Sequence, residues 1–155
     1  MDANLLRQYL ATVYELPTQN GPLRASMDGD IVADPSTLPE LLTKPFVVLT
    51  AFNPRSMLLP RKVNDARHNV MRDLLILGCY RVEGCVGYEE DPEGTWREPS
   101  WLVHGMERDE AIAFGRVFRQ NVILACRNAR PEIVVTDPTC DEIQKTIVGN
   151  WRVRT

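Results

Sequence analysis

The sequence lacks the residue patterns that several protein classes require. It has four cysteines but no C-x-x-C pair, and a chain of 155 residues does not need disulfides to build a core, so we expect reduced thiols. Its two histidines, His68 and His104, are too few to indicate a typical catalytic triad. No G-x-x-x-x-G-K-[ST] or G-x-G-x-x-G string occurs, which argues against phosphate-loop chemistry and dinucleotide binding.

Positive charge is also scarce. Lys and Arg number 18 against 21 Asp and Glu, and the resulting net charge of −3 has the wrong sign for a binder of nucleic-acid polymers. No stretch approaches the roughly 18 consecutive apolar residues of a membrane helix, and the N-terminus lacks the features of a signal peptide. We therefore expect a cytoplasmic protein that contacts neither membrane nor nucleic acid.

Metal and cofactor motifs are missing as well. Cys79 and Cys85 fall in one predicted strand, on one face but about 20 Å apart, too far to share an ion. The acidic tract 89–94 lacks the alternating ligands and glycine of a calcium loop, which favours a solvated hairpin tip. We expect no metal and no cofactor.

Apolar residues make up 44% and charged residues 25% of the chain, as in an ordinary folded domain, so we expect one domain over residues 1–155. Apolar residues at helical spacing predict a helix from Leu5 to Leu16, ended by Pro17 and Gly21. The proline-rich segment 17–45 reads as irregular, with one short strand near 30–33.

The core of the domain is predicted at about residues 46–126. The apolar run 46–52 predicts a central strand, and Pro60 opens a helix that ends at Gly78, with an apolar stripe of Val63, Ala66, Val70, Leu74 and Leu77. A hairpin of strands 79–87 and 96–103, a helix after Glu107 and a strand at 122–126 follow. This order predicts an α+β fold of the ferredoxin-like βαββαβ type, an antiparallel sheet with an extra N-terminal helix.

Residues 127–155 are predicted to form a C-terminal hairpin or tail. The strand 132–135 should lie antiparallel to 122–126. Ile147, Gly149, Trp151 and Val153 alternate with polar residues, which fits a final edge strand and a docking tail equally well.

Polar residues gather at one rim of the predicted sheet. The end of the first strand and the starts of the third and fourth meet there, and they carry Asn53, Arg55, Arg61, Asn64, Arg97, Glu98, Gln120 and Asn121. A helix N-terminus at the same rim would favour a bound anion. The alternative is that these amides only satisfy loop backbone and cap turns.

The same residues resemble a known family. The string Thr50-Ala51-Phe52-Asn53-Pro54, then Asn64, Leu74, Gly87, Glu98, Ser100 and the string 118–121, is similar to an uncharacterised bacterial family, domain of unknown function 3293, over about residues 46–125. The resemblance implies a small single-domain protein with no activity to transfer. It singles out Thr50, Asn53, Pro54, Asn64, Glu98, Ser100 and Gln120, and Arg119 departs from the small residue expected there.

Glu98 is the candidate general base, and Thr50, Asn53, Arg55, Asn64, Ser100 and Gln120 are the candidate ligand-binding residues. The alternative role for Glu98 is an anchor for the Asn53 loop or a salt bridge to Arg55 or Arg97. His68 is expected at the surface, and His104 at the opposite rim. Trp96, Trp101 and Tyr88 are expected to pack in the core rather than stack on a base.

Two functions follow from this pattern. The first is a small protein that binds an anionic or nucleotide-like ligand at the polar rim, with hydrolase-like chemistry as its catalytic version. The second is a protein–protein interaction module or homodimeric regulator that docks through the sheet face or its C-terminal edge, suggested by Trp151 and the terminal alternation.

Overall fold

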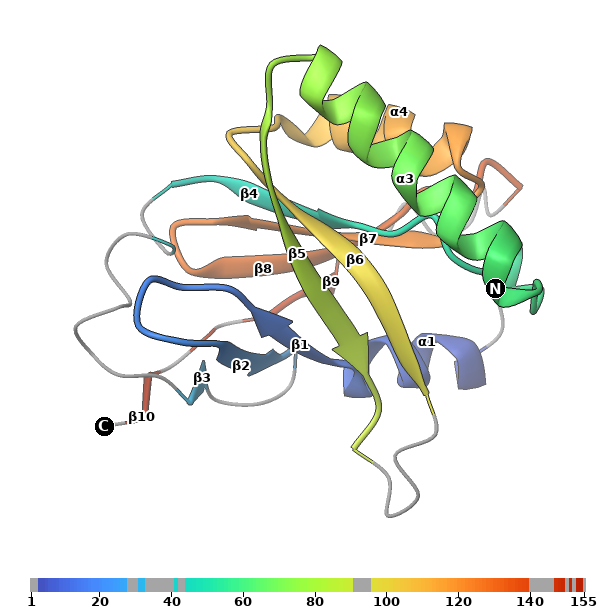
Figure 1. Ribbon diagram of the computed structural model, residues 1–155. Helices are drawn as coiled ribbons and strands as arrows, with labels where there is room; N and C mark the ends of the chain where they lie inside the picture. Colours follow the sequence, from blue (N-terminus) through green and yellow to red (C-terminus); the bar gives the residue numbers. More distant parts are fainter. Residues whose placement is uncertain are drawn as a thin grey trace.

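One long sheet links the described parts of the chain. The computed structural model describes residues 3–27, 31–32, 41, 44–90, 96–139, 147–149, 151 and 153–154. Within these ranges the strand order is β10-β3-β2-β1-β5-β6-β4-β7-β8-β9, and all pairs are antiparallel except β10 with β3 (Figure 1). None of the helices in these ranges is long and apolar enough to cross a membrane.

The elements have the following bounds. The helices are α1 (Ala3–Ala11), α3 (Arg61–Leu77) and α4 (Arg108–Val117), with a 3-10 turn η1 (Pro54–Ser56). The strands are β1 (Val13–Leu16), β2 (Leu23–Ser26), β3 (Ile31–Val32), β4 (Phe46–Leu49), β5 (Arg81–Tyr88), β6 (Arg97–His104), β7 (Val122–Arg127), β8 (Arg130–Val135), β9 (Ile147–Val148) and β10 (Val153–Arg154). The predicted antiparallel hairpin after residue 126 is confirmed as β7 and β8.

The fold class is only partly as predicted. The chain is a mixed helix-and-sheet protein, but it is not clearly a ferredoxin-like βαββαβ fold. The four predicted core strands are adjacent in the order β5-β6-β4-β7, yet further strands continue the sheet on both sides and it curls into a half barrel. An open four-stranded sheet would leave the edges of β5 and β7 unpaired, and here β1 and β8 cover them.

The N-terminal prediction is wrong beyond Ala11. Residues 13–16 form β1 rather than the end of a helix, because they pair with both β2 and β5. The hydroxyl of Thr12 donates to the Gln8 carbonyl at 2.9 Å and marks the helix end. The segment 17–45, predicted as irregular, contains β2, and its expected short strand is confirmed at Ile31–Val32; Asp30 and Ala33 lie outside the described residues.

Helix α3 has the predicted ends but not the predicted face. It begins after Pro60 and ends at Gly78, yet Val63, Val70, Leu74 and Leu77 of the expected apolar stripe are exposed. The buried residues are Asn64, Met71 and Leu75, at spacings of seven and four. Hydrogen bonds fix this rotation, because Asn64 bonds to Asn53 and the Trp101 indole donates to the His68 carbonyl at 3.0 Å.

Successive residues along the strands belong to two apolar clusters on opposite faces of the sheet. On β4, Val47 and Leu49 join the cluster beneath α3 and α4, whereas Phe46 and Val48 join the other cluster, against which Tyr9 and Leu10 of α1 pack. Figure 1 shows α3 and α4 together above the sheet and α1 on the other side. The sheet therefore separates a helix-covered face from a curled inner face closed at one end by α1.

Gly115 marks the closest approach of α4 to the sheet. A Cβ at this position would lie 2.8 Å from Thr136 Cγ2 and 3.0 Å from Ile123 Cγ2. We expect Gly115→Ala to lower the free energy of unfolding by about 1–2 kcal/mol, because the overpacking outweighs the ~1 kcal/mol gain in helix propensity. Urea unfolding of the parent and of Gly115→Ala measures this difference in the free energy of unfolding.

The double variant Gly115→Ala/Thr136→Ser is the matched test of this contact. It removes the Cγ2 methyl but keeps the hydroxyl that donates to the Gln120 carbonyl at 2.6 Å, so it should recover part of the loss. A Gly115→Ala variant more stable than the parent would contradict the packing described here.

Candidate functional site

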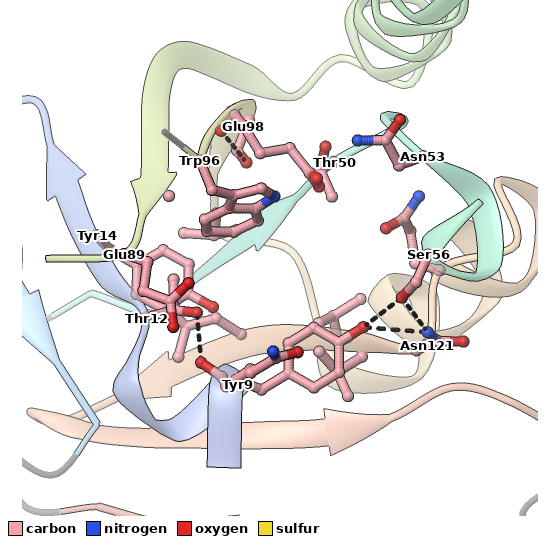
Figure 2. Close-up of a pocket in the computed structure, with 18 of the residues that line it drawn as sticks. Tyr9, Thr12, Tyr14, Thr50, Asn53, Ser56, Glu89, Trp96, Glu98 and Asn121 are labelled. Carbon is pink, nitrogen blue, oxygen red and sulfur yellow. Dashed lines mark hydrogen bonds between the residues drawn. The ribbon is translucent and has the colours of Figure 1, made fainter. Parts of the chain in front are cut away.

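A cavity of about 260 Å³ opens at the α1 end of the inner face. Its walls come from α1, β1 and the ends or starts of β4, β5, β6 and β7, so chain segments far apart in sequence meet around it (Figure 2). Most of the lining surface is apolar or aromatic, although ten of its twenty residues have polar or acidic side chains. The lining comprises Leu5, Gln8, Tyr9, Thr12, Tyr14, Val48, Thr50, Asn53, Ser56, Leu58, Gly87, Glu89, Trp96, Glu98, Ser100, Gln120, Asn121, Val122, Ile123 and Leu124.

The loop after β4 shapes one side of the cavity. Asn53, Arg55 and Ser56 all have positive φ, with values of 43°, 54° and 59°, a conformation that non-glycine residues adopt at some cost. Buried Asn64 holds the loop, since its Oδ1 accepts from the Asn53 backbone N–H at 2.9 Å and its Nδ2 donates to Asn53 Oδ1 at 2.8 Å. Asn64 therefore positions the Asn53 loop from outside the cavity lining.

Glu98 is the carboxylic acid in the polar part of the cavity. It lies on β6, opposite Gly87 of β5, and its side chain is partly buried. Burial raises the pKa of Glu98 to about 7, and hydrogen bonds with the side chains of Thr50 and Asn53 oppose that rise. At neutral pH both protonation states are populated, as a group that exchanges protons requires.

The neighbours of Glu98 are mostly uncharged. Thr50 donates to the Pro99 carbonyl at 3.0 Å and accepts from the Phe52 N–H at 3.1 Å, while buried Ser100 donates to the Glu98 carbonyl at 3.3 Å. Burial, and next the Glu98 charge, raise the pKa of Tyr14 well above its ordinary value, so this phenol stays neutral. The hydrogen bond between the side chains of Glu98 and Asn53 also gives a structural basis to the alternative role expected for Glu98, that of an anchor for the Asn53 loop.

The amides of Gln120 and Asn121 connect the cavity to the loop. Gln120 Nε2 donates to the Phe52 carbonyl at 3.0 Å. Asn121 Nδ2 donates to the Tyr9 hydroxyl at 3.1 Å and to Ser56 Oγ at 3.0 Å, so it ties α1 to the loop (Figure 2). Gln120 and Asn121 are both buried, and their hydrogen bonds hold the walls of the cavity in place.

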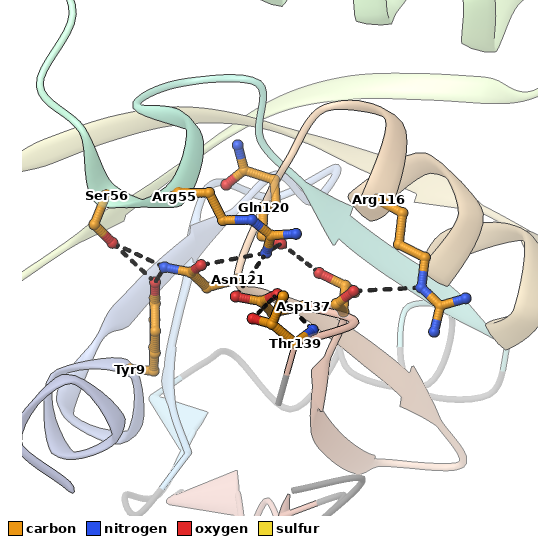
Figure 3. Close-up of polar contacts among 9 residues, drawn as sticks. Tyr9, Arg55, Ser56, Arg116, Gln120, Asn121, Asp137 and Thr139 are labelled. Atoms are coloured by element: carbon orange, nitrogen blue, oxygen red, sulfur yellow. Dashed lines mark hydrogen bonds and ion pairs between the residues drawn. The ribbon is translucent and has the colours of Figure 1, made fainter. Parts of the chain in front are cut away.

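The sequence predicts that Arg55 meets a ligand's negative charge, but its side chain lies outside the described cavity lining. Its guanidinium donates to the Gln120 carbonyl at 2.7 Å and forms an ion pair with Asp137 at 3.4 Å (Figure 3). The backbone and side chain of Thr139, together with Arg55, hold the pKa of Asp137 below its ordinary value. The positive φ of Arg55 turns it toward this network, and Arg55 ties the Asn53 loop to the end of β8.

The structure thus brings together Thr50, Asn53, Glu98, Ser100 and Gln120 around one cavity and places Asn64 directly behind it. Arg61 and Arg97 are absent from the described lining; Arg61 pairs with Asp65, and Arg97 lies over the Tyr88 ring. Sequence reasoning missed Tyr9, Thr12 and Tyr14, because no spacing linked the N-terminal segment to the rim. Trp96, expected in the core, is a wall of the cavity, whereas Trp101 packs as expected.

His68 is not the surface histidine expected from the sequence. Its ring stacks on Trp101 with centroids 4.2 Å apart and meets the edge of Phe52, so it is half-buried. Burial lowers the pKa of His68 to about 4, and its Nδ1 has no hydrogen-bond partner among the residues that the structure describes. A neutral ring between two aromatic side chains serves packing rather than proton transfer.

Metal ligands do not gather in the part of the chain that the structure describes, where no three His, Cys, Asp or Glu side chains cluster. Cys79 is exposed with a φ of 64° in the turn before β5, not inside that strand as predicted, whereas Cys85 is buried within it. Cys140 and the acidic positions 91–93 lie outside the described residues. His104 ends β6 away from the cavity and pairs with Glu83 at 2.5 Å.

Comparison with known proteins adds a family but no activity. Neither the curated proteins nor the solved structures contain a match to the chain. Residues 49–123 match the family described as Protein of unknown function (DUF3293), so the resemblance to that family carried by Thr50, Asn53, Asn64 and Glu98 is confirmed over this segment.

Proposed function

We propose that the protein binds a small molecule in the cavity beneath α1, with Glu98 as the group that exchanges a proton with it. The observation that carries this proposal is a carboxylic acid with a pKa near 7 at the wall of a largely apolar cavity. Ligand sites combine apolar walls with a few convergent polar groups and a perturbed ionisable residue. The volume of about 260 Å³ lies near the lower limit of such sites, which favours a small ligand.

The catalytic version of this proposal is a hydrolase-like reaction in which Glu98 acts as a general base on a bound water. Its support is the pKa of about 7, at which a carboxyl group both accepts and releases protons in neutral solution. Ser100 is a polar neighbour in this scheme rather than a nucleophile, because its hydroxyl bonds to a backbone carbonyl and no histidine belongs to the described lining.

The anionic or nucleotide-like ligand expected from the sequence has less support than an uncharged or cationic one. The ionisable acids of the described lining are Glu89 and Glu98, and that lining contains no Lys, Arg or His. The first residues of α3, Arg61 and Lys62, do not belong to the described lining, and the N–H groups of Val63 and Asn64 bond to the Pro60 carbonyl. An anion would face carboxylates without a compensating charge.

Two finer points of the sequence interpretation remain part of this proposal. We interpret β4, α3, β5, β6, α4 and β7 as a ferredoxin-like unit extended by strands on both sides, on the strength of the antiparallel order β5-β6-β4-β7. We also expect the protein to act in a cytoplasm, because its cysteines show no disulfide-forming pattern.

The second candidate function, a homodimer or docking module, rests on a different face. Trp151, whose place in the terminal alternation suggests docking, is 7% exposed and stacks on Phe46, so it does not present a docking surface. Of the eight large apolar side chains that reach solvent in the described residues, five lie on α3, including Val70 at 54% and Leu77 at 79% exposure. A size that grows with concentration in analytical ultracentrifugation, and that Leu77→Glu abolishes, would favour the dimer.

Filling the cavity tests the ligand-binding proposal. Gly87 lies in its wall, and a Cβ there would sit 3.4 Å from Thr12 Cγ2 and 3.7 Å from the Tyr14 ring, which are ordinary contacts. The two γ-methyl groups of Val would extend beyond that Cβ into the cavity, so we expect Gly87→Val to abolish the thermal shift of any small molecule that stabilises the parent in a screen of metabolites, including nucleotides and phosphorylated compounds. A circular-dichroism spectrum equal to the parent's checks that the variant is folded.

Gly84→Val is the matched control for this experiment. Gly84 lies on the same strand but three residues away, hence on the opposite face, and a Cβ there would meet the Trp101 ring at 3.8 Å. Gly84→Val should keep the thermal shift that the small molecule causes in the parent. Equal shifts in the parent and in Gly87→Val would show that binding occurs elsewhere and would refute the cavity as the site.

A further inference from the structure

The cavity beneath α1 has an unusual combination of walls. Tyr9 and Tyr14 come from the N-terminal segment and Trp96 from the start of β6, and Figure 2 shows the three rings around one space, with Trp96 and Tyr9 on opposite sides. Glu98 lies beside Trp96, and Glu89 follows the end of β5 at the same mouth. Aromatic faces and carboxylates thus surround the space, and the described lining supplies no positive charge.

Each of these groups attracts the same kind of ligand. The face of an aromatic ring carries negative charge and attracts a cation within about 6 Å, an effect that strengthens when water is excluded. A carboxylate in the same enclosure adds a full negative charge, which acts strongly because the surroundings are poorly solvated. An anion would be repelled by Glu89 and Glu98, and a neutral ligand would use the rings but not the charges.

We propose that this cavity binds an ammonium-type cation, with Tyr9, Tyr14 and Trp96 packing around the charged head and Glu98 as its counter-ion. This inference rests on the proposed small-molecule function and names the chemical class of the ligand. The polar side of the cavity, which includes Asn53 and Ser56, then receives the uncharged, hydrogen-bonding end of the same molecule.

Binding of such a cation is coupled to the protonation of Glu98. In the described lining the titratable groups besides Glu98 are Tyr9 of α1, Tyr14 of β1 and Glu89 after β5, with Cys85 of β5 next to Tyr14, whereas β4 and β7 contribute uncharged side chains. Burial raises the pKa of Tyr14 and of Cys85, so both stay neutral between pH 6 and 8. Since Glu98 titrates near pH 7, protons compete with the cation most strongly below that pH, and binding strengthens as the pH rises through 7 and levels off about one unit above it.

Three isosteric probes separate charge from shape: choline, its neutral analogue 3,3-dimethylbutan-1-ol, and the anion 3,3-dimethylbutanoate. In calorimetric titrations at pH 8 we expect choline to bind at least about tenfold more tightly than the alcohol, and the anion to bind most weakly. Between pH 8 and pH 6 the affinity for choline should fall about tenfold, in proportion to the ionised fraction of Glu98, while that for the alcohol stays constant.

Two variants assign the effect to Glu98. Glu98→Gln should remove both the preference for choline over the alcohol and its pH dependence, while the alcohol still binds. Glu90→Gln removes one negative charge from an exposed neighbouring position outside the described lining. It should therefore keep both the preference for choline over the alcohol and its pH dependence.

The outcomes distinguish the two levels of the proposal. If the alcohol or the anion binds as tightly as choline at pH 8, and Gly87→Val abolishes that binding, the cavity binds small molecules but the cation inference is overturned. If none of the three probes binds, the cation inference is overturned as well, and the screen with Gly87→Val decides the proposed function separately.

Discussion

Replacement of Glu98 by Gln is expected to raise the free energy of unfolding by about 2 kcal/mol at pH 8 and to leave it nearly unchanged at pH 4. Burial raises the pKa of Glu98 from its ordinary 4.5 to about 7, so the native state prefers the protonated acid. Between these pH values the native protein holds a proton that the unfolded chain releases. The parent therefore loses stability as the pH rises from about 4.5 to 7, by at most about 3 kcal/mol.

Glutamine has nearly the same shape and no charge, so it avoids this loss at high pH. It gives up part of the hydrogen bonding with Thr50 and Asn53, which reduces the expected gain below that limit. Urea unfolding of the parent and the variant at pH 4, 6 and 8 measures the difference. Glu90→Gln, at an exposed site, is the control and should change stability by less than about 0.5 kcal/mol at each pH.

The opposite result would identify Glu98 as a structural anchor. If Glu98→Gln destabilises the protein at every pH, the carboxylate contributes more through its bonds to the Asn53 loop than burial costs it. A gain at pH 8 means that the protein keeps an ionisable acid in the cavity at the expense of stability. Residues retained in this way are characteristic of functional sites.

The segments with strong periodicity were predictable from sequence, and those decided by tertiary pairing were not. The ends of helix α3 at Pro60 and Gly78 are predictable because these residues start and stop helices locally. The prediction of the buried face of α3 is wrong. The hydrogen bonds of the Asn64 side chain and of the His68 carbonyl set the rotation of the helix about its axis, and the number of apolar residues on each face does not. The helical spacing of apolar residues continues through residues 13–16, but these residues form a strand because they pair with β2 and β5.

The candidate site was partly predictable for a geometric reason. The topology of strands and crossovers brings the end of β4 and the starts of β6 and β7 to one rim, and this fact alone gathers Asn53, Glu98 and Gln120. The aromatic walls Tyr9 and Tyr14 belong to a segment whose place beside β5 no local pattern encodes. The prediction for Arg55 failed for another reason, since a backbone φ of 54° points it toward Asp137.

Replacement of Trp151 by Ala is expected to lower the free energy of unfolding by about 3–5 kcal/mol. The indole is 7% exposed, stacks on Phe46 with centroids 6.1 Å apart, and donates from Nε1 to the Ser26 carbonyl at 3.0 Å. Alanine would leave a cavity inside the curled face and would remove the hydrogen bond from the indole to β2. One side chain near the C-terminus thus links the second strand to the centre of the sheet.

Chemical denaturation of three variants measures the contribution of this contact. Trp151→Phe keeps most of the stacking on Phe46 and loses the bond to Ser26, so we expect a loss of about 1–2 kcal/mol. Trp96→Ala is the matched control, because it truncates a partly exposed indole at the cavity wall and should cost less than Trp151→Ala. If both tryptophan-to-alanine variants cost the same small amount, residue 151 does not close the inner face, and the docking-tail interpretation of the C-terminus regains its support.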